Sequence, residues 1–544
     1  MGLRDRAAAV LKRLGEQIAP PRASAALSSA TFGSGYEGAQ AQRRLFGFRP
    51  TEASINSLLL TAGPMLRARA RALVRNNGYA RKAQRVFVSN LVGTGIRPVP
   101  RIDDAGLKAT VATLWDDWTD EADADGLLDF YGMQVLVARA LFDAGECFLR
   151  VRPRYARDNL TVPVQVQLLE SEFCPYDMNR FAENGNIIRN GIEFNGIGQR
   201  VAYWFYKVHP GDYLLVSTNQ FGWTRVPASD VIHVFEPIRP GQVRGVSWLA
   251  AAIVRAYILD QYDDAELERK KVAALFAGFI KKTGDSDAEL PVPVGPQDQP
   301  VAGQADSSQN APGEGITGLT PGMLQVLLQG EDITFSNPAD VGGNYEAFEY
   351  RQLLALCASM DLPYSSVTGD RSKATYSSER ASMLDMRSAI AQLQRNVMVF
   401  QLCRAMYRRV ISEGVIAGEL PIKAGEFNAS PKSFNRARWV LPRREWVDPL
   451  KDVQADRIAV RSGFESREEV VLARGKTLEQ LDSEIAAGNA SSDALGLVLD
   501  SDPRLTDFRG SSNPPDTANP NPASDDDKNP DAAVTIDDEE EEAA

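Results

Sequence analysis

The stretch DLPYSSVTGDRSKATYSSERASML, residues 361–384, lies between two long helical patterns and contains residue types found in both enzyme sites and loops. A serine-lysine nucleophile pair requires the lysine three residues after the serine. Here Lys373 follows Ser372 directly, and the residue three positions before it is Asp370. No G-x-S-x-G motif occurs, and the two histidines of the chain lie in a different segment. We therefore do not expect a nucleophile and a base in this stretch.

The same stretch has a clear structural interpretation. Pro363 disfavours the helical conformation at the residue before it, so the preceding helix is expected to end there. Gly369, followed by an acid, favours a turn. Ser377 or Ser378 is expected to cap the helix that follows. The sequence therefore predicts a structured loop at 361–374 whose serines form caps and turns.

Long helices surround this loop, and a β-rich region precedes them. The pattern of apolar and charged residues over 246–272 predicts one helix with an apolar first half and a charged second half. Further helices are expected at 344–360 and at 375–412. Between 146 and 235, short segments rich in β-branched and aromatic residues alternate with turn signals, which predicts strands. The predicted fold class is α+β, mainly helical, with one β-rich subdomain.

Charge is unevenly distributed along the chain, whose formal net charge is −12. Residues 1–101 carry 17 Arg or Lys against 4 Asp or Glu, whereas 511–544 carry 11 acids against one lysine. The basic segment is either a solvated face or a contact for nucleic acid, an acidic partner or a neighbouring subunit. The acidic body argues against tight wrapping of DNA, which requires Lys and Arg to replace counterions.

The sequence lacks the motifs of most cofactor sites. The four cysteines lie far apart and the chain has two histidines, so neither disulfides nor a zinc site are expected, although counting alone leaves a carboxylate magnesium site open. The triplet Gly475-Lys476-Thr477 lacks the first glycine of a phosphate-binding loop, because Val470 stands there. Thr477 is better interpreted as a helix N-cap. No apolar run approaches the roughly 20 residues of a membrane span.

Four segments, in this order, are similar to the portal proteins of tailed phages, specifically the lambda type. They are ARALVRNNGYARKAQ, VIHVFEPIRPGQVRGVSWL, YEAFEYRQLLALCASMDLPYSSVTGDRSKATYSSERAS and VDPLKDVQADRIAVRSGFES. The resemblance covers about residues 40–490. It implies a structural protein rather than an enzyme: a homo-oligomeric ring, commonly a dodecamer, at one vertex of the capsid. Double-stranded DNA would enter the head through its channel during genome packaging and leave during ejection.

The resemblance also implies an order of structural regions. These are an N-terminal helix and flexible arm at 1–50, a wing at 51–245, a stem helix at 246–272, a clip at 273–343 with a disordered insertion at 284–322, a second stem helix at 344–360, a tunnel loop at 361–374, a long wing helix with following strands at 375–444, a helical crown at 445–500 and a disordered acidic tail at 501–544.

Three groups of candidate site residues follow from this plan. The tunnel loop would face DNA with Tyr364, Ser365, Ser366, Thr368, Asp370, Arg371 and Lys373. The stem would line the channel with Asp260, Asp263, Asp264, Glu266, Lys270 and Lys271. Residues of the family motifs with structural roles would be Arg75, Asn76, Asn77, Gly78, Tyr79, His233, Glu236, Gly245, Tyr376, Ser377 and Arg380.

The partners implied by the resemblance are the large terminase subunit, a head-tail connector protein, and the major capsid and scaffolding proteins. Double-stranded DNA would pass without sequence readout, because acidic stem residues repel phosphates and sparse lysines offer only salt-sensitive contacts. The protein would lie at the portal vertex of the virion, and in the host cytoplasm during assembly, with no membrane or cofactor. Two alternatives remain: a metal-dependent DNA-processing enzyme that uses acids such as Asp370, and a membrane-associated pore.

Overall fold

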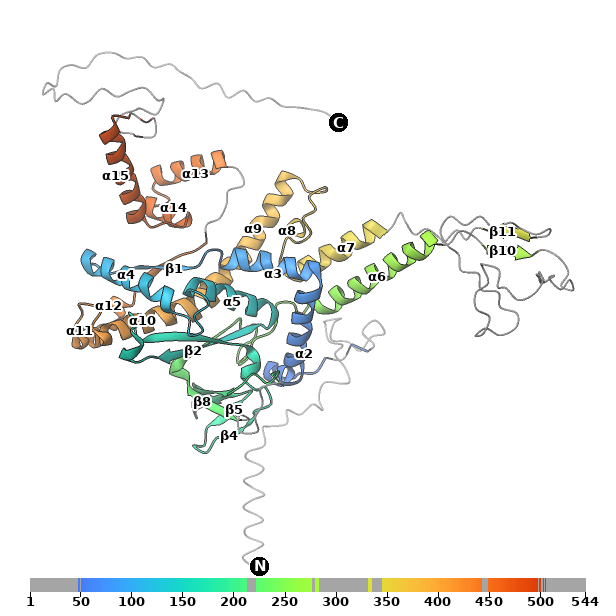
Figure 1. The fold of residues 1–544 in the computed structure, drawn as a ribbon, viewed down its shortest axis with the longest axis horizontal. Coiled ribbons are helices and arrows are strands. Elements are labelled where there is room, and N and C mark those ends of the chain that lie inside the picture. Colours follow the sequence, from blue (N-terminus) through green and yellow to red (C-terminus); the bar gives the residue numbers. More distant parts are fainter. Residues whose placement is uncertain are drawn as a thin grey trace, which may run out of the picture.

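The computed structural model describes most of the chain apart from its ends and several internal segments. The described residues are 47, 48, 50–212, 222–275, 279–282, 331–334, 345–442, 449–497, 499, 502 and 504. Helices and sheets are combined in one body, which confirms the α+β class (Figure 1). Nearly all of the predicted N-terminal arm, the whole 284–322 insertion and nearly all of the acidic tail lie outside the described residues.

Four helices precede the β-rich region and lie beside it (Figure 1). They are α2 (Ile55–Asn76), α3 (Gly78–Leu91), α4 (Ala105–Glu121) and α5 (Phe130–Asp143). Trp115 and Trp118 of α4 are buried with ring centroids 5.0 Å apart, as core residues three positions apart on a helix should be. Phe130 packs within 5.5 Å of both tryptophan rings. This aromatic cluster joins α4 to α5.

Asn77 separates α2 from α3. Its backbone N–H donates to the carbonyl of Leu73, and its side chain accepts from the N–H of Ala80, so one residue ends the first helix and caps the second. Asn77 is extended, at φ −101°, and Gly78 already belongs to α3, so no left-handed residue is needed.

The β-rich region consists of two sheets. The three-stranded sheet has the order β3-β2-β9, and the five-stranded sheet has the order β4-β5-β6-β7-β8, with all neighbours antiparallel. The strands are β2 (Glu146–Pro153), β3 (Val164–Leu169), β4 (Arg180–Phe181), β5 (Ile187–Arg189), β6 (Ile192–Phe194), β7 (Arg200–Tyr206), β8 (Trp223–Pro227) and β9 (Val231–Phe235). Short 3₁₀ turns occur at η3 (Ala156–Asp158), η4 (Ser171–Phe173) and η5 (Ala228–Asp230).

Helices α6 (Ile253–Leu275) and α7 (Tyr345–Ala358) project side by side from the body (Figure 1). Beyond them, β10 (Phe279–Lys282) pairs antiparallel with β11 (Glu331–Thr334). The predicted helix start at 246 is wrong, because the backbone N–H of Trp248 donates to the carbonyl of Phe142 rather than within a helix. The chain forms tight turns over 248–252, and α6 begins only at Ile253.

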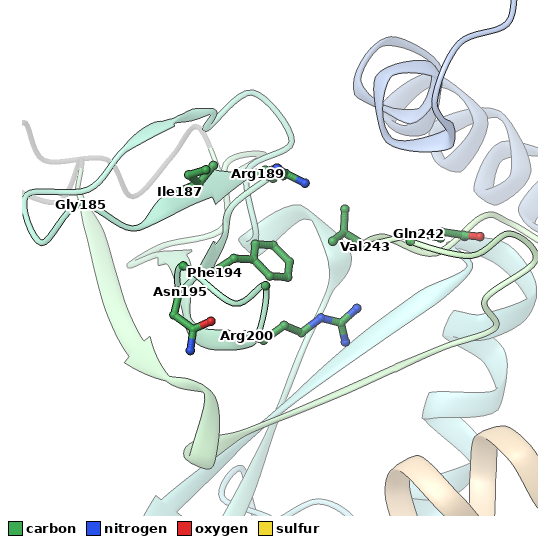
Figure 2. Close-up of a pocket in the computed structure, with 11 residues that line it drawn as sticks. Gly185, Ile187, Arg189, Phe194, Asn195, Arg200, Gln242 and Val243 are labelled. Carbon is green, nitrogen blue, oxygen red and sulfur yellow. The ribbon is translucent and has the colours of Figure 1, made fainter. Parts of the chain in front are cut away.

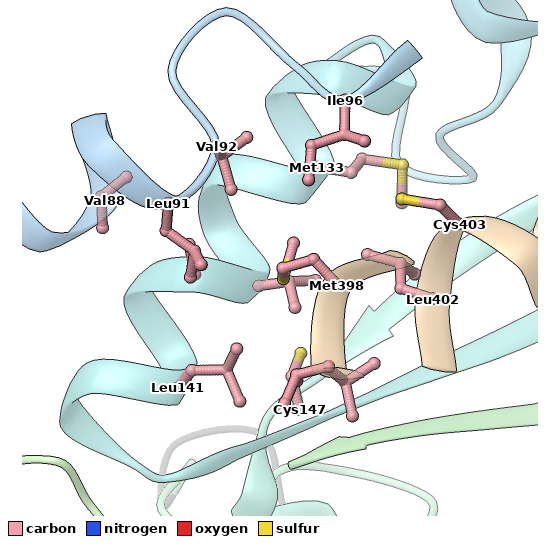
Figure 3. Packing of buried hydrophobic residues seen from close by; sticks show 14 of the residues in the cluster. Val88, Leu91, Val92, Ile96, Met133, Leu141, Cys147, Met398, Leu402 and Cys403 are labelled. Carbon is pink, nitrogen blue, oxygen red and sulfur yellow. The ribbon is translucent and has the colours of Figure 1, made fainter. Parts of the chain in front are cut away.

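A long helix crosses the body and extends a few residues beyond the predicted 375–412. It comprises α9 (Tyr376–Leu393), a π-helical segment η6 (Gln394–Cys403) and α10 (Arg404–Ala417). Met398, Leu402 and Cys403 of η6 pack into the core against α3 and α5 (Figure 3). The helix ends at Gly418, at φ +86°, a left-handed conformation that glycine adopts without strain. All four cysteines are buried and free, as the sequence predicted.

The remaining elements continue from α10 toward the C-terminus. They are α11 (Ala424–Ala429), α12 (Pro431–Phe434), β12 (Ala437–Val440), α13 (Pro449–Arg461), α14 (Arg467–Ala473) and α15 (Leu478–Leu495). Strand β12 pairs antiparallel with β1 (Arg97–Pro100). Helices α13 to α15 form a group beside α4, to which Lys108 and Glu479 link them (Figure 1). Thr477 caps α15, as predicted. None of the helices described is long and apolar enough to cross a membrane.

Candidate functional site

The first half of the predicted tunnel loop is a packed helical turn. Residues Tyr364–Thr368 form α8, which contacts α3. Ser365 is only 6% exposed, and its hydroxyl donates to the carboxylate of Glu379 at 2.6 Å. The hydroxyl of Tyr364 donates to Asp370 at 3.2 Å. The structure therefore removes Ser365 from the exposed candidates, and Ser366 and Thr368 are half-buried.

The second half of the loop is exposed and carries its cations. Arg371, Ser372 and Lys373 all face solvent. The Lys373 ammonium lies 3.2 Å from the carboxylate of Glu346 on α7 and 4.3 Å from the centroid of the Tyr350 ring. Arg371 has no ion pair among the described residues, which leaves its guanidinium free to meet an anion.

The N-cap of α9 differs from the prediction. Thr375, and neither Ser377 nor Ser378, is the cap: its hydroxyl accepts from the N–H of Ser378, whose side chain accepts from the N–H of Thr375 in return. This reciprocal capping box begins α9 one turn earlier than a cap at Ser378 would. Tyr376, Ser377 and Arg380 are exposed in the first turns of α9, and Arg380 lies 3.9 Å from Asp452 of α13.

Two of the acidic stem candidates are held by hydrogen bonds within the chain. The Asn77 amide donates to Asp260 at 3.0 Å, and the Tyr345 hydroxyl donates to Asp263 at 3.0 Å. Burial, with Asp260 and Asp264 nearby, raises the pKa of Asp263. Asp260 and Asp264 remain exposed. Asn77 thus connects the junction of α2 and α3 to the base of the stem, and Tyr79 reinforces it by donating to Glu349 at 3.4 Å.

Farther along α6, charges pair locally. Glu266 lies 2.6 Å from Arg269 and 3.9 Å from Lys270, and Lys271 lies 2.7 Å from Glu268. Arg75, Asn76 and Gly78 are exposed at the neighbouring α2–α3 junction. The described surface of α6 therefore combines exposed carboxylates with cations already engaged by acids, an arrangement that disfavours tight binding of phosphates.

A buried ion pair joins the segment before α6 to the sheets. Arg244 and Glu146 are fully buried, with a shortest nitrogen–oxygen distance of 2.5 Å. The guanidinium also donates to the carbonyls of Cys174, Asn190 and Ser171 at 2.9–3.2 Å. It lies 3.8 Å from the centroid of the Tyr176 ring. All of its donor directions are therefore satisfied, as a buried charge requires.

Glu146 receives donors from several elements at once. The N–H of Gly245 donates to it at 2.8 Å, and Ser171 donates through its hydroxyl. His233 lies 3.1 Å away. Burial opposes ionisation of Glu146, but Arg244 and His233 hold its pKa well below the usual range. Burial likewise lowers the pKa of His233 to about 4 despite that hydrogen bond, so the histidine is neutral and packed.

Close backbone contacts complete this anchor. A Cβ on Gly245 would lie 2.1 Å from the carbonyl oxygen of Gly145, and one on Gly145, at φ +84°, would lie 2.1 Å from Val246. The indole N–H of Trp248 donates to the carbonyl of Met360 at 2.8 Å, just after α7. The segment leading into α6 is therefore fixed to the sheet and to the end of α7. Nearby Glu236 is half-buried, and burial with Asp361 raises its pKa.

One group of residues could hold a metal ion by geometry. Ligand atoms of Glu170, Glu172 and His209 lie within 4.8 Å of one another. However, Arg67 and Arg71 approach the Glu172 carboxylate to 2.8 and 2.5 Å. Two guanidiniums already neutralise these acids, so a cation would have to displace them, and the donor set does not fit a metal site.

A hollow of about 490 Å³ lies between the β5–β6 hairpin, β7 and the segment before Arg244 (Figure 2). Arg189 and Arg200 contribute the charges, while Phe194 and Val243 contribute apolar surface. No acid or nucleophile occurs among the described residues that line it. The hollow therefore offers no set of groups for acid-base chemistry.

Sequence reasoning missed Glu146, Arg244 and Thr375. Glu146 could have been noticed as a carboxylate at the start of the apolar strand ECFLRV, where an unpaired charge is costly. Its partner lies 98 residues away, and nothing local identifies it. Thr375 precedes the predicted caps by two or three residues, within the usual error of a helix boundary.

Comparisons with known proteins identify a family. The model of the family described as phage portal protein, lambda family, matches residues 41–394. The probable portal protein of Halomonas phage phiHAP-1 is 24% identical, with 91% of this chain and 94% of that protein covered. Portal protein B of Escherichia phage lambda is 23% identical, with 86% and 90% covered.

Among solved structures, the neck of a native gene transfer agent particle is similar at 14% identity, with 74% of this chain and 92% of that chain covered and a TM-score of 0.40. A portal protein of the HK97 family from Corynebacterium diphtheriae is similar at 11% identity, with 60% and 89% covered and a TM-score of 0.29.

Proposed function

The chain belongs to the lambda family of phage portal proteins and is a virion component, and we propose that its copies form the ring through which the genome passes. The observation that carries this proposal is the family match, which spans 354 residues from 41 to 394 and includes the stem and the tunnel loop. Twelve copies is the number that the family resemblance implies. Double-stranded DNA would move inward during packaging and outward during ejection.

The outer face of α6 supports assembly into a ring. Val254, Tyr257 and Ile258 are 64%, 55% and 58% exposed, and their spacing places them on one face of the helix. The described residues of a single copy leave this apolar face uncovered. In a ring, each protomer's exposed face is its neighbour's partner, so the stem of the adjacent copy would bury it.

The charges of the stem and loop support weak, sequence-independent contact with DNA. Asp260 and Asp264 are exposed and would repel phosphates, whereas Arg371 and Lys373 would attract them across the solvent-exposed part of the loop. No tight grip results, which suits a wall past which DNA slides. A tight, sequence-specific complex between the purified ring and DNA would contradict this assignment.

The remaining regions would divide the contacts with other proteins. Residues 273–343 would form the clip that docks the large terminase subunit and later the head-tail connector. Helices α13 to α15 would form a crown facing the capsid interior, and the two sheets would belong to the wing, near the major capsid and scaffolding proteins. These assignments rest on the family plan. The described contacts supply no observation in favour of a metal-dependent DNA-processing enzyme, because Tyr364 and the N–H of Ser372 already bond the Asp370 carboxylate.

Negative-stain images of the purified protein test the ring. Rings with a central hole are expected, and monomers that hydrolyse DNA or nucleotide would overturn the proposal. A second experiment tests the loop: replacing Arg371 and Lys373 with alanine is expected to impair DNA packaging or retention while rings still assemble. Unchanged packaging would show that the loop lies away from the channel.

A further inference from the structure

A large groove lies beside the long helix, away from the stem. It has a volume of about 1370 Å³ and runs between η6 and α10 on one side and the segment from α12 to β12 on the other. Its apolar lining includes Val399, Trp439 and Leu441, with Phe400 64% exposed at its edge. The hydroxyl of Tyr407 is buried there without a hydrogen-bond partner in the described part of the chain.

The charge of this groove is opposite to that of the whole chain. No described acid lines it, whereas six exposed cations do. They are Arg101, Arg395, Arg404, Arg408, Lys432 and Arg436. None of the six forms an ion pair with a carboxylate within the described residues. The chain as a whole has 72 acids against 60 Arg and Lys. A groove lined by six unpaired cations and no described acid is therefore much more positive than the composition of the chain would give.

An adjoining hollow extends the same surface. It shares Phe400, Gln401, Arg404 and Arg408 with the groove and adds Arg200 of β7. Its described lining also contains no acid. The positive surface therefore continues from β12, across α10, to the sheets, and a short polyanion rather than a single ion matches its extent.

We propose that the occupant of this groove is the acidic C-terminal segment of the protein, residues 511–544. This segment carries 11 acids and one lysine, and seven of the acids stand in the two runs DDD and EEEE. The last described helix ends at Leu495, which leaves 49 residues to the C-terminus at 544. At roughly 3.3 Å per extended residue, that length spans on the order of 160 Å, so reach does not limit the contact.

Two physical arguments favour this occupant over DNA. A tethered segment meets the groove at an effective concentration that is on the order of millimolar for short flexible links, without any diffusional encounter. Duplex DNA, by contrast, must diffuse to the groove and is repelled by residues 511–544, which carry 11 acids and one lysine. The segment would neutralise the groove and thereby prevent it from holding phosphates, leaving the channel as the only route for DNA.

Peptide binding tests the proposal on full-length protein. The protein is a variant whose own tail competes less, because seven of its 11 acids are made neutral. Asp525, Asp526 and Asp527 are changed to Asn, and Glu539, Glu540, Glu541 and Glu542 are changed to Gln. The probe is a fluorescent peptide with the sequence of residues 511–544, followed by anisotropy at about 50 mM and at about 500 mM salt. Binding at low salt that is lost at high salt is expected.

Paired charge reversals locate the binding site. Adding Arg404→Glu and Arg408→Glu, four residues apart on α10, is expected to weaken peptide binding by about tenfold or more. The matched control adds Arg81→Glu and Arg85→Glu, two exposed arginines with the same spacing on α3, and should change binding by less than about twofold. Thermal unfolding of each variant confirms that the fold is retained.

A labelled random-sequence duplex distinguishes DNA from the tail. If the tail occupies the groove, duplex binding that depends on Arg404 and Arg408 is weak in the wild-type chain and increases when the tail acids are amidated. Groove-dependent duplex binding that is equal with and without tail acids would overturn the proposal. The proposal would also be overturned if the peptide did not bind, or if Arg404→Glu and Arg408→Glu left its binding unchanged.

Discussion

The anchor at Glu146 and the tunnel loop at Lys373 use the same chemistry in opposite environments. Both side chains of the Glu146–Arg244 pair are 0% exposed, whereas Lys373 and Glu346 are 48% and 84% exposed. Removing one partner of a buried pair leaves an uncompensated charge in the interior. When one partner of an exposed pair is removed, water solvates the charge that remains. The protein therefore has costly polar contacts where the segment before α6 meets the sheets and inexpensive ones on the exposed loop before α9.

Breaking the buried pair should give the largest effect. Glu146→Gln leaves Arg244 without its counter-charge and should lower the free energy of unfolding by roughly 3–5 kcal/mol. Urea unfolding followed by circular dichroism measures the change. The control is Glu346→Gln, which makes the same substitution in the exposed pair and should cost less than about 1 kcal/mol. Equal losses from the two changes would refute the contrast.

The backbone contact beside that pair gives the second prediction. A methyl group at Gly245 would lie 2.1 Å from the carbonyl oxygen of Gly145, a backbone atom that cannot rotate away. Gly245→Ala should therefore lower the free energy of unfolding by roughly 1–3 kcal/mol, as overpacking typically does. Gly425→Ala, where a Cβ meets nothing within 4 Å, is the control and should be neutral or slightly stabilising. A neutral Gly245→Ala would mean that the two segments separate easily.

Asp143, near the Glu146–Arg244 pair, should make the stability of the protein depend on pH. Burial raises its pKa to about 6, against the opposing effect of Arg71. Because the folded chain holds this proton more tightly than the unfolded chain, the contribution of Asp143 to stability is favourable at low pH and is lost as pH rises through about 6. Asp143→Asn should therefore stabilise the protein by roughly 1 kcal/mol at pH 8, and by less at pH 5.

Thermal unfolding at the two pH values, with exposed Asp103→Asn as control, measures that difference. A larger gain at pH 5 than at pH 8 would reverse the sign and show that Asp143 is stabilised as a carboxylate by Arg71.

The exposed loop should show the smallest effect on stability. Lys373→Ala removes a half-exposed ammonium and its ion pair, which should change the free energy of unfolding by less than about 0.5 kcal/mol. Any loss in DNA packaging by the Arg371 and Lys373 double variant can then be assigned to contact with DNA rather than to unfolding. A loss above about 2 kcal/mol would place Lys373 with the anchor instead.

Local signals in the sequence identified features that depend on neighbouring residues. Thr477 was predicted to cap a helix, and it caps α15. The predicted helices at 344–360 and 375–412 and the predicted strands between 146 and 235 are also present. The same signals failed at boundaries. Residues 248–252 remain outside α6 because Ser247 and Trp248 donate hydrogen bonds to the carbonyl of Phe142 in another element. Hydrophobic periodicity along the sequence does not predict such bonds between distant segments.

The sequence by itself determined the mixture of long helices with a β-rich region and, through four motifs in order, the family. Helical periodicity, caps and turn residues act over a few positions, so they can be read without coordinates. Only the tertiary structure decided that Glu146 meets Arg244, that Ser365 is buried, and that six cations from distant segments line one groove. Such contacts depend on which elements pack together, and electrostatic energy depends on burial, which no local pattern of residues specifies.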